Sequence, residues 1–583
     1  MRCYSRRKYG LTSRYDPQAR KPRRPTDTNA RWRPRSSEVT RAVRFIERSG
    51  VLPVLEQELD SNVGRPRFLS LKALLVAALV NGFQDGHRAL IRKIAVTIDG
   101  LSKHRLKELG CRLDHWPNDL YRRVDDLYNN LCRALEHGFE AEIDGEAVWV
   151  DHVWFHNRIG SSPVPESLRR STSLAIDGTD VETAARLHSG SEEIETNGSE
   201  QPKRTSETTS SSEEQRPKAL VLAQGDDGRK IYTLDPDARG GYRTRTNRRP
   251  GGTFVGYELH LGVQTPDVTY TNGVDVATLG GPVPGLILLS SLVPAGSSKA
   301  EAVVPLLLEQ KRTGAPIDDI VVDPGYTIPD PAEFFTPLHK AGIHITYQIT
   351  SHHRGVQPFN DHAIVLHGHL VSSTLPKKYR ELALPPLGAN QEERAPYEEN
   401  WNHVARHFRF SLHKHPNSKG VTRWKDPLDA GRLRSRDVPR SMRGPKTSPL
   451  VKVKNPSSWE KTVRATPESL PRWSKWMTGT TAHRVAYYGR RQVAESANAA
   501  LEGEFASINS RHFRVFELHK INILLAFTIA GYNDDRIRAF CAAHQEPNPN
   551  DAEADATSPS PQDEDEPTEA DDGPAKEGRD PPG

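Results

Sequence analysis

The chain has little cysteine, with only four among its 583 residues, and none of them belongs to a Cys-x-x-Cys pair. Their positions, Cys3, Cys111, Cys132 and Cys541, are too scattered to predict a zinc knuckle or a disulfide framework. Sparse, unpaired cysteines are typical of proteins in a reducing compartment. We therefore expect a cytoplasmic protein.

Long hydrophobic runs are also missing, since hydrophobic residues make up 35% of the chain and the mean hydropathy is −0.66. The longest apolar runs, Ala73–Val80 and Ile521–Ala530, are too short to span a membrane and predict buried core helices. The arginine-rich N-terminus lacks the apolar segment of a signal peptide. We expect no membrane partner.

Three common catalytic motifs are absent from the sequence. It contains no Walker phosphate loop, no dinucleotide-binding glycine pattern and no Gly-x-Ser-x-Gly nucleophile elbow. The classes of nucleotide hydrolase, dinucleotide-dependent enzyme and serine hydrolase that carry these motifs are therefore not indicated.

Charge is unevenly distributed along the chain, although the net charge is only +5. Residues 2–37 hold 12 Arg and Lys against 2 Asp, whereas residues 546–583 hold 13 Asp and Glu against 2 Lys and Arg. We predict a disordered basic arm over residues 1–37, which either meets nucleic acid or is a solvated terminus. Residues 536–583 are predicted to form a disordered acidic tail.

Residues 38–150 show helical periodicity. Ala42, Phe45 and Ile46 recur at helical spacing, and so do the apolar residues of Leu120–Leu135. The polar faces carry many Arg and Lys. This region is predicted to be either a helical DNA-binding domain or a bundle that braces or dimerises the protein.

From residue 151 the pattern changes to short β-rich runs with a crossover helix, which predicts an α/β domain. Ala300–Thr313 reads as that helix. We assign residues 151–349 and 481–535 to the α/β domain, residues 189–218 to a disordered insertion and residues 350–480 to a basic insertion domain. The predicted strands are Ala147–Phe155, Ser173–Asp177, Lys230–Leu234, Gly256–Val263, Leu286–Leu292, Ile320–Asp323 and His344–Ile349, and the late helices are Tyr488–Glu504 and Val515–Ala530.

Three carboxylates in unlike settings are the main candidates for a site. Asp177 and Asp323 each end an apolar run that reads as a strand, and Glu495 lies on the predicted late helix with Arg491 and Asn498 on the same face. Carboxylates are the ligands that Mg²⁺ prefers, and paired Mg²⁺ ions catalyse displacement at phosphorus. The three acids therefore indicate a metal-dependent phosphodiester enzyme, with Asp180 as a rival for Asp177.

Around these acids the chain resembles the Asp-Asp-Glu transposases of bacterial insertion sequences. The matching pieces are Leu174-Ala-Ile-Asp177-Gly-Thr179, Val321-Val-Asp323-Pro-Gly-Tyr326 and Tyr488-x2-Arg491-x3-Glu495. The family motif continues with a lysine, associated with DNA binding, where this chain has Glu502. Arg239–Tyr242 and Gly256–His260 look like the second and third strands of the family's catalytic domain.

The resemblance implies an RNase H-like mixed sheet flanked by helices, with a large insertion before the last catalytic helix and an N-terminal all-helical domain. It implies a transposase that cuts double-stranded DNA at transposon ends and joins the strand to target DNA. Asp177, Asp323 and Glu495 would bind Mg²⁺ or Mn²⁺. Tyr488, Arg491 and Asn498 would contact DNA or support the site, in a homodimer associated with the nucleoid.

Two further residue sets in the insertion domain are candidates. His403 and His407 have the spacing of a helical metal pair, although ordinary polar histidines are the commoner explanation. Tryptophans interleaved with basic residues fit either a DNA track with base stacking or a small satellite core. Those tryptophans are Trp424, Trp459, Trp473 and Trp476.

Two other functions remain open from the sequence. A catalytically silent DNA-binding protein derived from a transposase is one, and Glu502 and the acidic tail leave room for it. An RNase H-like nuclease is the other.

Overall fold

The computed structural model describes parts of the chain. The predicted arm to residue 32, most of the Ser/Thr/Glu-rich stretch (197–216), and the tail from residue 552 lie outside them. The described residues are 33–59, 67–84, 89–114, 116–117, 119–196, 217–243, 251–270, 277–327, 330, 332–386, 388–414, 417, 421–433, 462–466 and 476–551.

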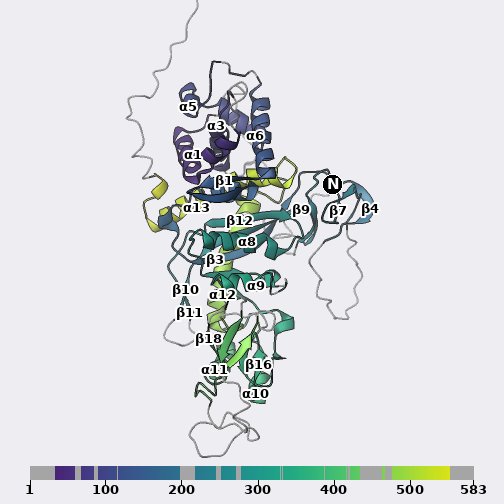
Figure 1. Ribbon diagram of the computed structural model, residues 1–583, viewed down its shortest axis with the longest axis vertical. Helices are drawn as coiled ribbons and strands as arrows, with labels where there is room; N and C mark the ends of the chain where they lie inside the picture. The colour runs from purple at the N-terminus through teal and green to yellow at the C-terminus, as the bar shows by residue number, and fades with distance from the viewer. Residues whose placement is uncertain are drawn as a thin grey trace, which may run out of the picture.

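The N-terminal region is helical, as predicted, and occupies one end of the molecule (Figure 1). α3 is apolar on all sides and buried, and amphipathic helices surround it. The helices are α1 (Ser36–Ser49), α2 (Val51–Leu59), α3 (Leu71–Gly82), α4 (Ile91–Asp99), α5 (Lys103–Glu108) and α6 (Leu120–His137).

A hairpin and a helix follow where one strand was expected. β1 (Phe139–Ile143) pairs with β2 (Glu146–Val150), and α7 (His152–Ser161) begins directly afterwards. The prediction of a strand over Ala147–Phe155 is therefore wrong in its second half. Asp151 explains the change, because its carboxylate accepts hydrogen bonds from the backbone amides of Val153 and Trp154 and so caps α7.

A six-stranded mixed sheet lies at the centre, with the strand order β12-β9-β3-β13-β14 and β8 added on β9. β3 is antiparallel to β9 and parallel to β13, which is parallel to β14. The predicted mixed α/β architecture is confirmed. The strands are β3 (Ser173–Glu182), β8 (Arg239–Arg243), β9 (Gly252–Thr265), β12 (Ile287–Pro294), β13 (Asp319–Val322) and β14 (His344–Tyr347).

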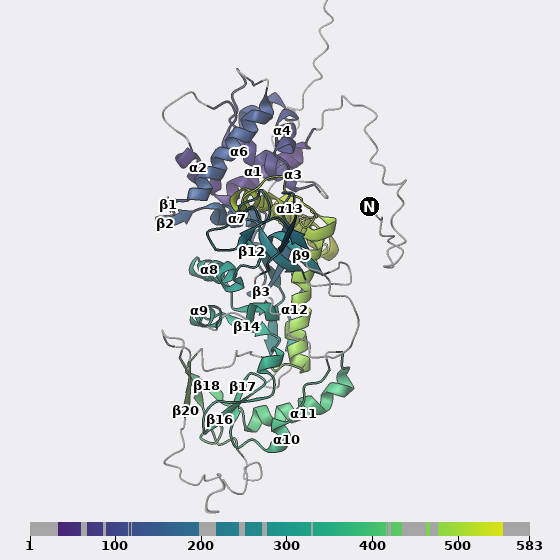
Figure 2. The same ribbon diagram turned by 90° about the vertical axis from the view of Figure 1, so that its right-hand side faces the viewer.

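Different helices cover the two faces of this sheet (Figure 2). α8 (Lys299–Arg312) and α9 (Phe335–Lys340) connect the parallel strands, and α8 packs on Leu174 and Ile176. The other face belongs to a separate core that holds Ala175 and Val321 together with residues of α12 (Thr481–Ala499). Alternate residues of β3 therefore face α8 and α12.

β3 continues past the residue at which the sequence predicted its end. Asp177 lies inside the strand, and Asp180, expected beyond it, is also part of β3. The strand continues because β9 is long enough to pair with it as far as Glu182. The polar residues Asp180 and Glu182 made this half of the strand hard to predict. Both have a partner in the structure, since Arg243 forms ion pairs with both.

The last helix is longer than predicted. α13 (Leu518–His544) runs past residue 535, so the predicted tail boundary falls inside a helix. α13 packs against α3 at a point where glycines allow the backbones to touch, because a methyl group on Gly82 would lie 2.3 Å from the Phe527 carbonyl oxygen. The N-terminal helices and the sheet consequently share one hydrophobic core.

Among the described residues, three small hairpins are attached to the sheet, two of them near β8 and the third against α12. β4 (Ser189–Glu193) pairs with β5 (Lys218–Ala219), so the start of the predicted disordered insertion is a strand. Ile194 follows β4 directly and is buried in the main hydrophobic core, so it attaches this polar segment to the fold. The other hairpins join β6 (Ala223–Gln224) to β7 (Lys230–Ile231) and β10 (Val268–Tyr270) to β11 (Ala277–Leu279).

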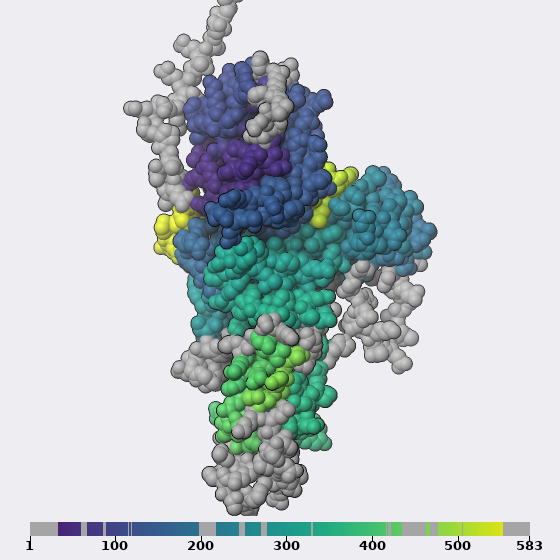
Figure 3. All heavy atoms as spheres, viewed as in Figure 1, coloured from purple at the N-terminus to yellow at the C-terminus, as the bar shows by residue number. Residues whose placement is uncertain are grey.

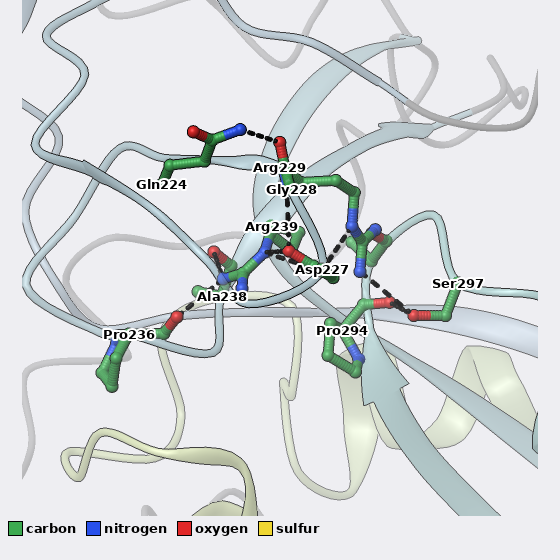
Figure 4. A network of polar contacts seen from close by, with 10 residues as sticks. Gln224, Asp227, Gly228, Arg229, Pro236, Ala238, Arg239, Pro294 and Ser297 are labelled. Carbon is green, nitrogen blue, oxygen red and sulfur yellow. Dashed lines mark hydrogen bonds and ion pairs between the residues drawn. The ribbon is translucent and has the colours of Figure 1, made fainter.

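Asp227 fastens the β6–β7 hairpin to the sheet (Figure 4). Its carboxylate accepts hydrogen bonds from Arg229 and from the buried Arg239, and Arg229 also donates to the Ala295 carbonyl at 2.6 Å. Burial acts to raise the pKa of Asp227, but these two guanidinium groups outweigh it and lower the pKa to about 2. The network is structural, because it joins the hairpin to β8 and to the residue that follows β12.

The insertion forms a lobe with its own small cores at the end opposite the N-terminal helices (Figures 1 and 3). No helix among the described residues is long and apolar enough to cross a membrane. The elements of the lobe are β15 (Val356–Pro358), β16 (Ala363–Leu366), β17 (His369–Ser372), α10 (Lys377–Arg380), α11 (Gln391–His407), β18 (Ser411–Lys414), β19 (Thr422–Lys425) and β20 (Thr462–Ala465).

Candidate functional site

Asp177 and Asp323 lie level with each other on neighbouring strands. The last parallel pair between β3 and β13 joins Ile176 to Val322, and the two acids are the next residues on their strands. Both acids fall on the face that α12 covers, because they are two residues beyond Ala175 and Val321. Sheet register alone therefore brings together residues that are 146 positions apart.

α12 brings the third acid and two further predicted residues to the same place. Arg491, Glu495 and Asn498 share one face of this helix. Arg491 Nη2 lies 3.0 Å from Asp323 Oδ1 and 3.4 Å from Glu495 Oε1. Asn498 Nδ2 donates to Asp177 Oδ2 at 3.2 Å. Five of the six predicted site residues, all except Tyr488, thus belong to one cluster, which we call the acid cluster: Asp177, Asp323, Arg491, Glu495 and Asn498.

The rotation of α12 is fixed by an arginine that the sequence reasoning missed. Arg490 is fully buried, and its guanidinium lies 2.7 Å from Asp319 Oδ2 and donates to Thr346 Oγ1 at 3.2 Å. Asp319 is the first residue of β13, and Thr346 belongs to the neighbouring strand β14. These contacts fix one side of α12 on the sheet and so determine which way its other side faces. Nothing in the sequence distinguished Arg490 from its neighbour Arg491.

Burial dominates the electrostatics of Asp177. It raises the pKa of this carboxyl to about 6, with Asp323 adding to the effect, while Arg491 and a hydrogen bond from the Gly178 amide act against it. Asp323 accepts a hydrogen bond from the Gly325 amide at 3.1 Å. The Pro-Gly-Tyr turn after Asp323 therefore holds that carboxylate in place.

The donor chemistry of the acid cluster fits a hard cation, although Arg491 occupies part of the position. Two carboxylates converge with Asn498, whose buried Oδ1 has no hydrogen-bond partner among the described residues. Oxygen donors of this kind suit Mg²⁺. Within the described residues, however, no group of three His, Cys, Asp or Glu side chains is arranged to hold a metal ion. Glu495 pairs with Arg491 instead and is about half exposed.

Tyr488 and Glu502 lie at opposite ends of this helix region. The Tyr488 hydroxyl donates to Gln348 Oε1 at 2.8 Å, toward the insertion lobe and away from the acids. Glu502 follows α12 in a π-helical segment, Ala500–Glu504, and accepts a hydrogen bond from the Thr179 hydroxyl. The acid at the family's lysine position is thus tied to β3, two residues beyond Asp177.

Three residues behind the acids were not predicted as site residues. His260 Nδ1 and the Tyr326 hydroxyl are 2.6 Å apart, and both side chains are buried. The Lys299 ammonium lies over the Tyr326 ring, 4.9 Å from its centroid. Tyr326 carried a signal, since it belongs to the turn after Asp323, but Lys299 carried none.

A cavity of about 210 Å³ lies where the insertion lobe meets α12. Three arginines, Arg354, Arg394 and Arg484, line it, and none of the described residues that line it is acidic. Tyr488 is also part of its wall, so the cavity lies on the same helix as the acid cluster. The rest of the lining is Gln348, Leu384, Pro385, Pro386, Thr478, Gly479 and His483.

The other predicted features of the insertion lobe have structural explanations. The ring centroids of His403 and His407 lie 4.8 Å apart with the rings tilted, and His407 Nδ1 lies 2.9 Å from the Arg432 carbonyl oxygen. Trp424 and Trp476 are buried in cores, so the proposal that they stack on bases is wrong for these two. Trp459 and Trp473 lie outside the described residues.

Comparison of the chain with known proteins found no matching family model, no matching curated protein and no matching solved structure.

Proposed function

We propose that the chain is a DNA transposase that cuts DNA at transposon ends and transfers the strand to a target with the acid cluster as its catalytic site. The observation that carries the proposal is the convergence of Asp177, Asp323 and Glu495, from two strands and a late helix, at one end of a mixed sheet. The sheet, its flanking helices and the insertion before α12 are compatible with the RNase H-like domain that the resemblance implies.

Asp177, Asp323 and the Asn498 amide oxygen would hold the divalent cation, and Glu495 would complete the set. Mg²⁺, or Mn²⁺ in its place, would activate the attacking oxygen and stabilise the leaving oxygen at phosphorus. The residues of the chain position these groups. The Gly178 and Gly325 amides aim the two aspartates, and Arg490 fixes the rotation of α12 that presents Glu495 and Asn498.

Arg491 has a defined part in this proposal. Its guanidinium neutralises Asp323 and Glu495 in the absence of cation and DNA. When a cation takes over that neutralisation, the guanidinium is free to bind a phosphate oxygen, to which it is geometrically suited. Double-stranded DNA is therefore the partner, and paired DNA ends would be held by a homodimer.

A catalytically silent DNA-binding protein is the second candidate, because one observation favours it. Arg491 already pairs with two of the three acids, and no three-acid metal cluster is formed within the described residues. If that arrangement persists with DNA bound, the cluster holds the fold together and performs no chemistry. Cleavage assays separate the two candidates.

The decisive experiment is cleavage of a supercoiled plasmid that carries the DNA flanking the gene, with and without Mg²⁺. We expect the wild type to nick the plasmid only with the cation. Asp323→Asn and Glu495→Gln should each lower the nicking rate at least ~10³-fold, since each removes a carboxylate that would hold the catalytic cation. Binding of the same DNA should stay within about threefold of wild type.

Asp318→Asn is the matched control. Asp318 precedes β13 at the end opposite Asp323, is largely exposed and pairs with Lys311. Its substitution removes the same charge from the same strand without touching the acid cluster, so nicking should be unchanged. A wild type that binds the DNA but never nicks it would support the silent DNA-binding protein. Full strand transfer by Asp323→Asn would refute both the catalytic role of the acid cluster and the silent candidate.

A further inference from the structure

Lys299 is the first residue of α8 and reaches the acid cluster from the sheet face opposite α12. α8 packs on the face formed by Leu174 and Ile176, whereas Arg491 belongs to the helix on the other face. The two cations therefore approach the same strand ends from opposite sides of the sheet.

The ammonium group of Lys299 lies close to Asp323. A methyl group added to Gly325 would lie 2.9 Å from Lys299 Nζ and 3.2 Å from Asp323 Oδ2, so both atoms border the same small space. Glycine at position 325 keeps that space open. Lys299 also acts to lower the pKa of Asp177, so its charge is felt at this aspartate too.

The position of the ammonium is held by packing, and its hydrogen-bonding capacity is unused. It lies over the ring of the buried Tyr326, whose hydroxyl contacts His260. Within the described part of the chain, Lys299 Nζ makes neither an ion pair nor a hydrogen bond. Arg491, by contrast, is already paired with two carboxylates. A fixed ammonium with three free donors is a ready contact for an anion.

The acidic residue Glu502 gives a reason for a basic residue, in addition to Arg491, beside the acid cluster. It stands where the resemblance leads one to expect a DNA-binding lysine, and its carboxylate is tied to Thr179 on β3. The α12 side of the acid cluster therefore carries an extra negative charge that would repel a DNA strand. A basic residue from another element can offset it, and Lys299 lies beside Asp323 and is unpaired within the described part of the chain.

We propose that Lys299 contacts a phosphate of the DNA strand at the acid cluster, from the face opposite Arg491, and so supplies the basic contact that position 502 lacks. The proposal rests on the proposed function, because it takes DNA as the ligand. It assigns a phosphate-binding residue that the sequence motifs do not include.

The test measures binding of a duplex with the native flanking sequence by fluorescence anisotropy, in EDTA, over a series of salt concentrations. Each phosphate contact adds about 0.9 to the slope of log Kd against log salt for duplex DNA. We expect Lys299→Met to lower that slope by about 0.9 and to weaken binding roughly threefold to tenfold. Methionine keeps the length and the contact with Tyr326, and Lys299→Arg should retain the slope.

Lys340→Met is the control. Lys340 ends α9 on the same side of the sheet and is exposed, so its loss removes one charge without touching the acid cluster. Its slope and Kd should match the wild type. An unchanged slope for Lys299→Met, with wild-type binding intact, would overturn the role of Lys299 alone. A wild type that does not bind this duplex would overturn the proposed function as well.

Discussion

At the level of single residues, Arg491 balances the negative charge of the acid cluster. Three carboxylates close together repel one another, and the raised pKa of Asp177 shows part of this repulsion together with the effect of burial. The guanidinium bridges Asp323 and Glu495 and offsets their charges. A bound cation would offset the same charges, so Arg491 and metal are alternative solutions to one electrostatic problem.

This competition gives a prediction for Arg491→Met. In EDTA the variant should be less stable than the wild type by roughly 1 kcal/mol, because the partly exposed acids lose their counter-charge. Mg²⁺ should raise the thermal midpoint of the variant more than that of the wild type, since binding to the folded state stabilises it. Thermal unfolding with EDTA and with Mg²⁺ measures both effects. Equal shifts in the two proteins would show that metal and Arg491 do not compete.

At the level of elements, α12 links the acid cluster to the insertion lobe. Arg490 orients the helix on β13 and β14, and Tyr488 and Arg484 on the same helix form part of the arginine-lined cavity. Arg484 donates to the Ala389 carbonyl at 2.9 Å, so it also connects the helix to the lobe. A DNA strand at the acids would meet these charges within two or three helical turns.

We predict that the cavity arginines contribute to DNA affinity but not to chemistry. Arg354→Met removes an exposed cation from the cavity wall and should weaken duplex binding about threefold, with a salt slope lower by about 0.9. Single-turnover nicking at saturating DNA should keep its rate. Arg406→Met, at an exposed position of α11 outside the cavity, is the control and should bind as the wild type does. Loss of single-turnover rate in Arg354→Met would contradict this division of roles.

Sequence patterns located the core of the sheet and the five residues of the acid cluster, but they did not show where helices and strands continue through polar residues. The last helix was predicted to end at Ala530, because polar residues follow from Asn533 onward. Asn533 and Asp534 are fully buried, and their partners come from distant segments: the Asn533 amide bonds the backbone of Ile287, and Asp534 pairs with Arg41. A local pattern cannot show a partner hundreds of residues away.

The same limit explains the unpredicted site residues. The strand-end contexts of Asp177 and Asp323 were readable because apolar runs mark buried strands. Lys299 reaches the acids only because β12 and β13 lie on either side of β9 and β3, so that α8 starts near the end of β13. That placement follows from strand order, which the spacing of motifs does not contain.

At the level of the whole molecule, one core joins the N-terminal helices, the sheet and α13, and buried histidines are built into it and its neighbours. Burial lowers the pKa of His156 to about 4 and that of His369 to about 3. It also lowers the pKa of His483 to about 4. His156 connects distant segments, since its ring nitrogens contact the Asn522 carbonyl and the Ser290 hydroxyl. These rings stay neutral in the folded protein over the physiological range.

Acid should therefore destabilise the protein at pH values above the ordinary pKa range of carboxylates. The unfolded chain takes up protons on these histidines below about pH 6.5, whereas the folded protein does not until about pH 4. Their contribution to the free energy of unfolding is complete above about pH 6.5 and falls with pH by up to ~1.4 kcal/mol per unit for each group. Asp177 works in the opposite sense between its ordinary pKa and about 6, but it is a single group.

Urea unfolding at about pH 7 and about pH 5 measures this dependence. We expect a clearly lower midpoint at the acid pH, and a smaller difference between the two values for His483→Phe. The phenyl ring can keep the stacking on Tyr487 but takes up no proton, although it gives up the hydrogen bond to the Tyr347 carbonyl. The comparison rests on the change with pH, so a lower absolute stability of the variant does not affect it. Equal midpoints for the wild type at both pH values would show that the folded protein can protonate these rings without loss.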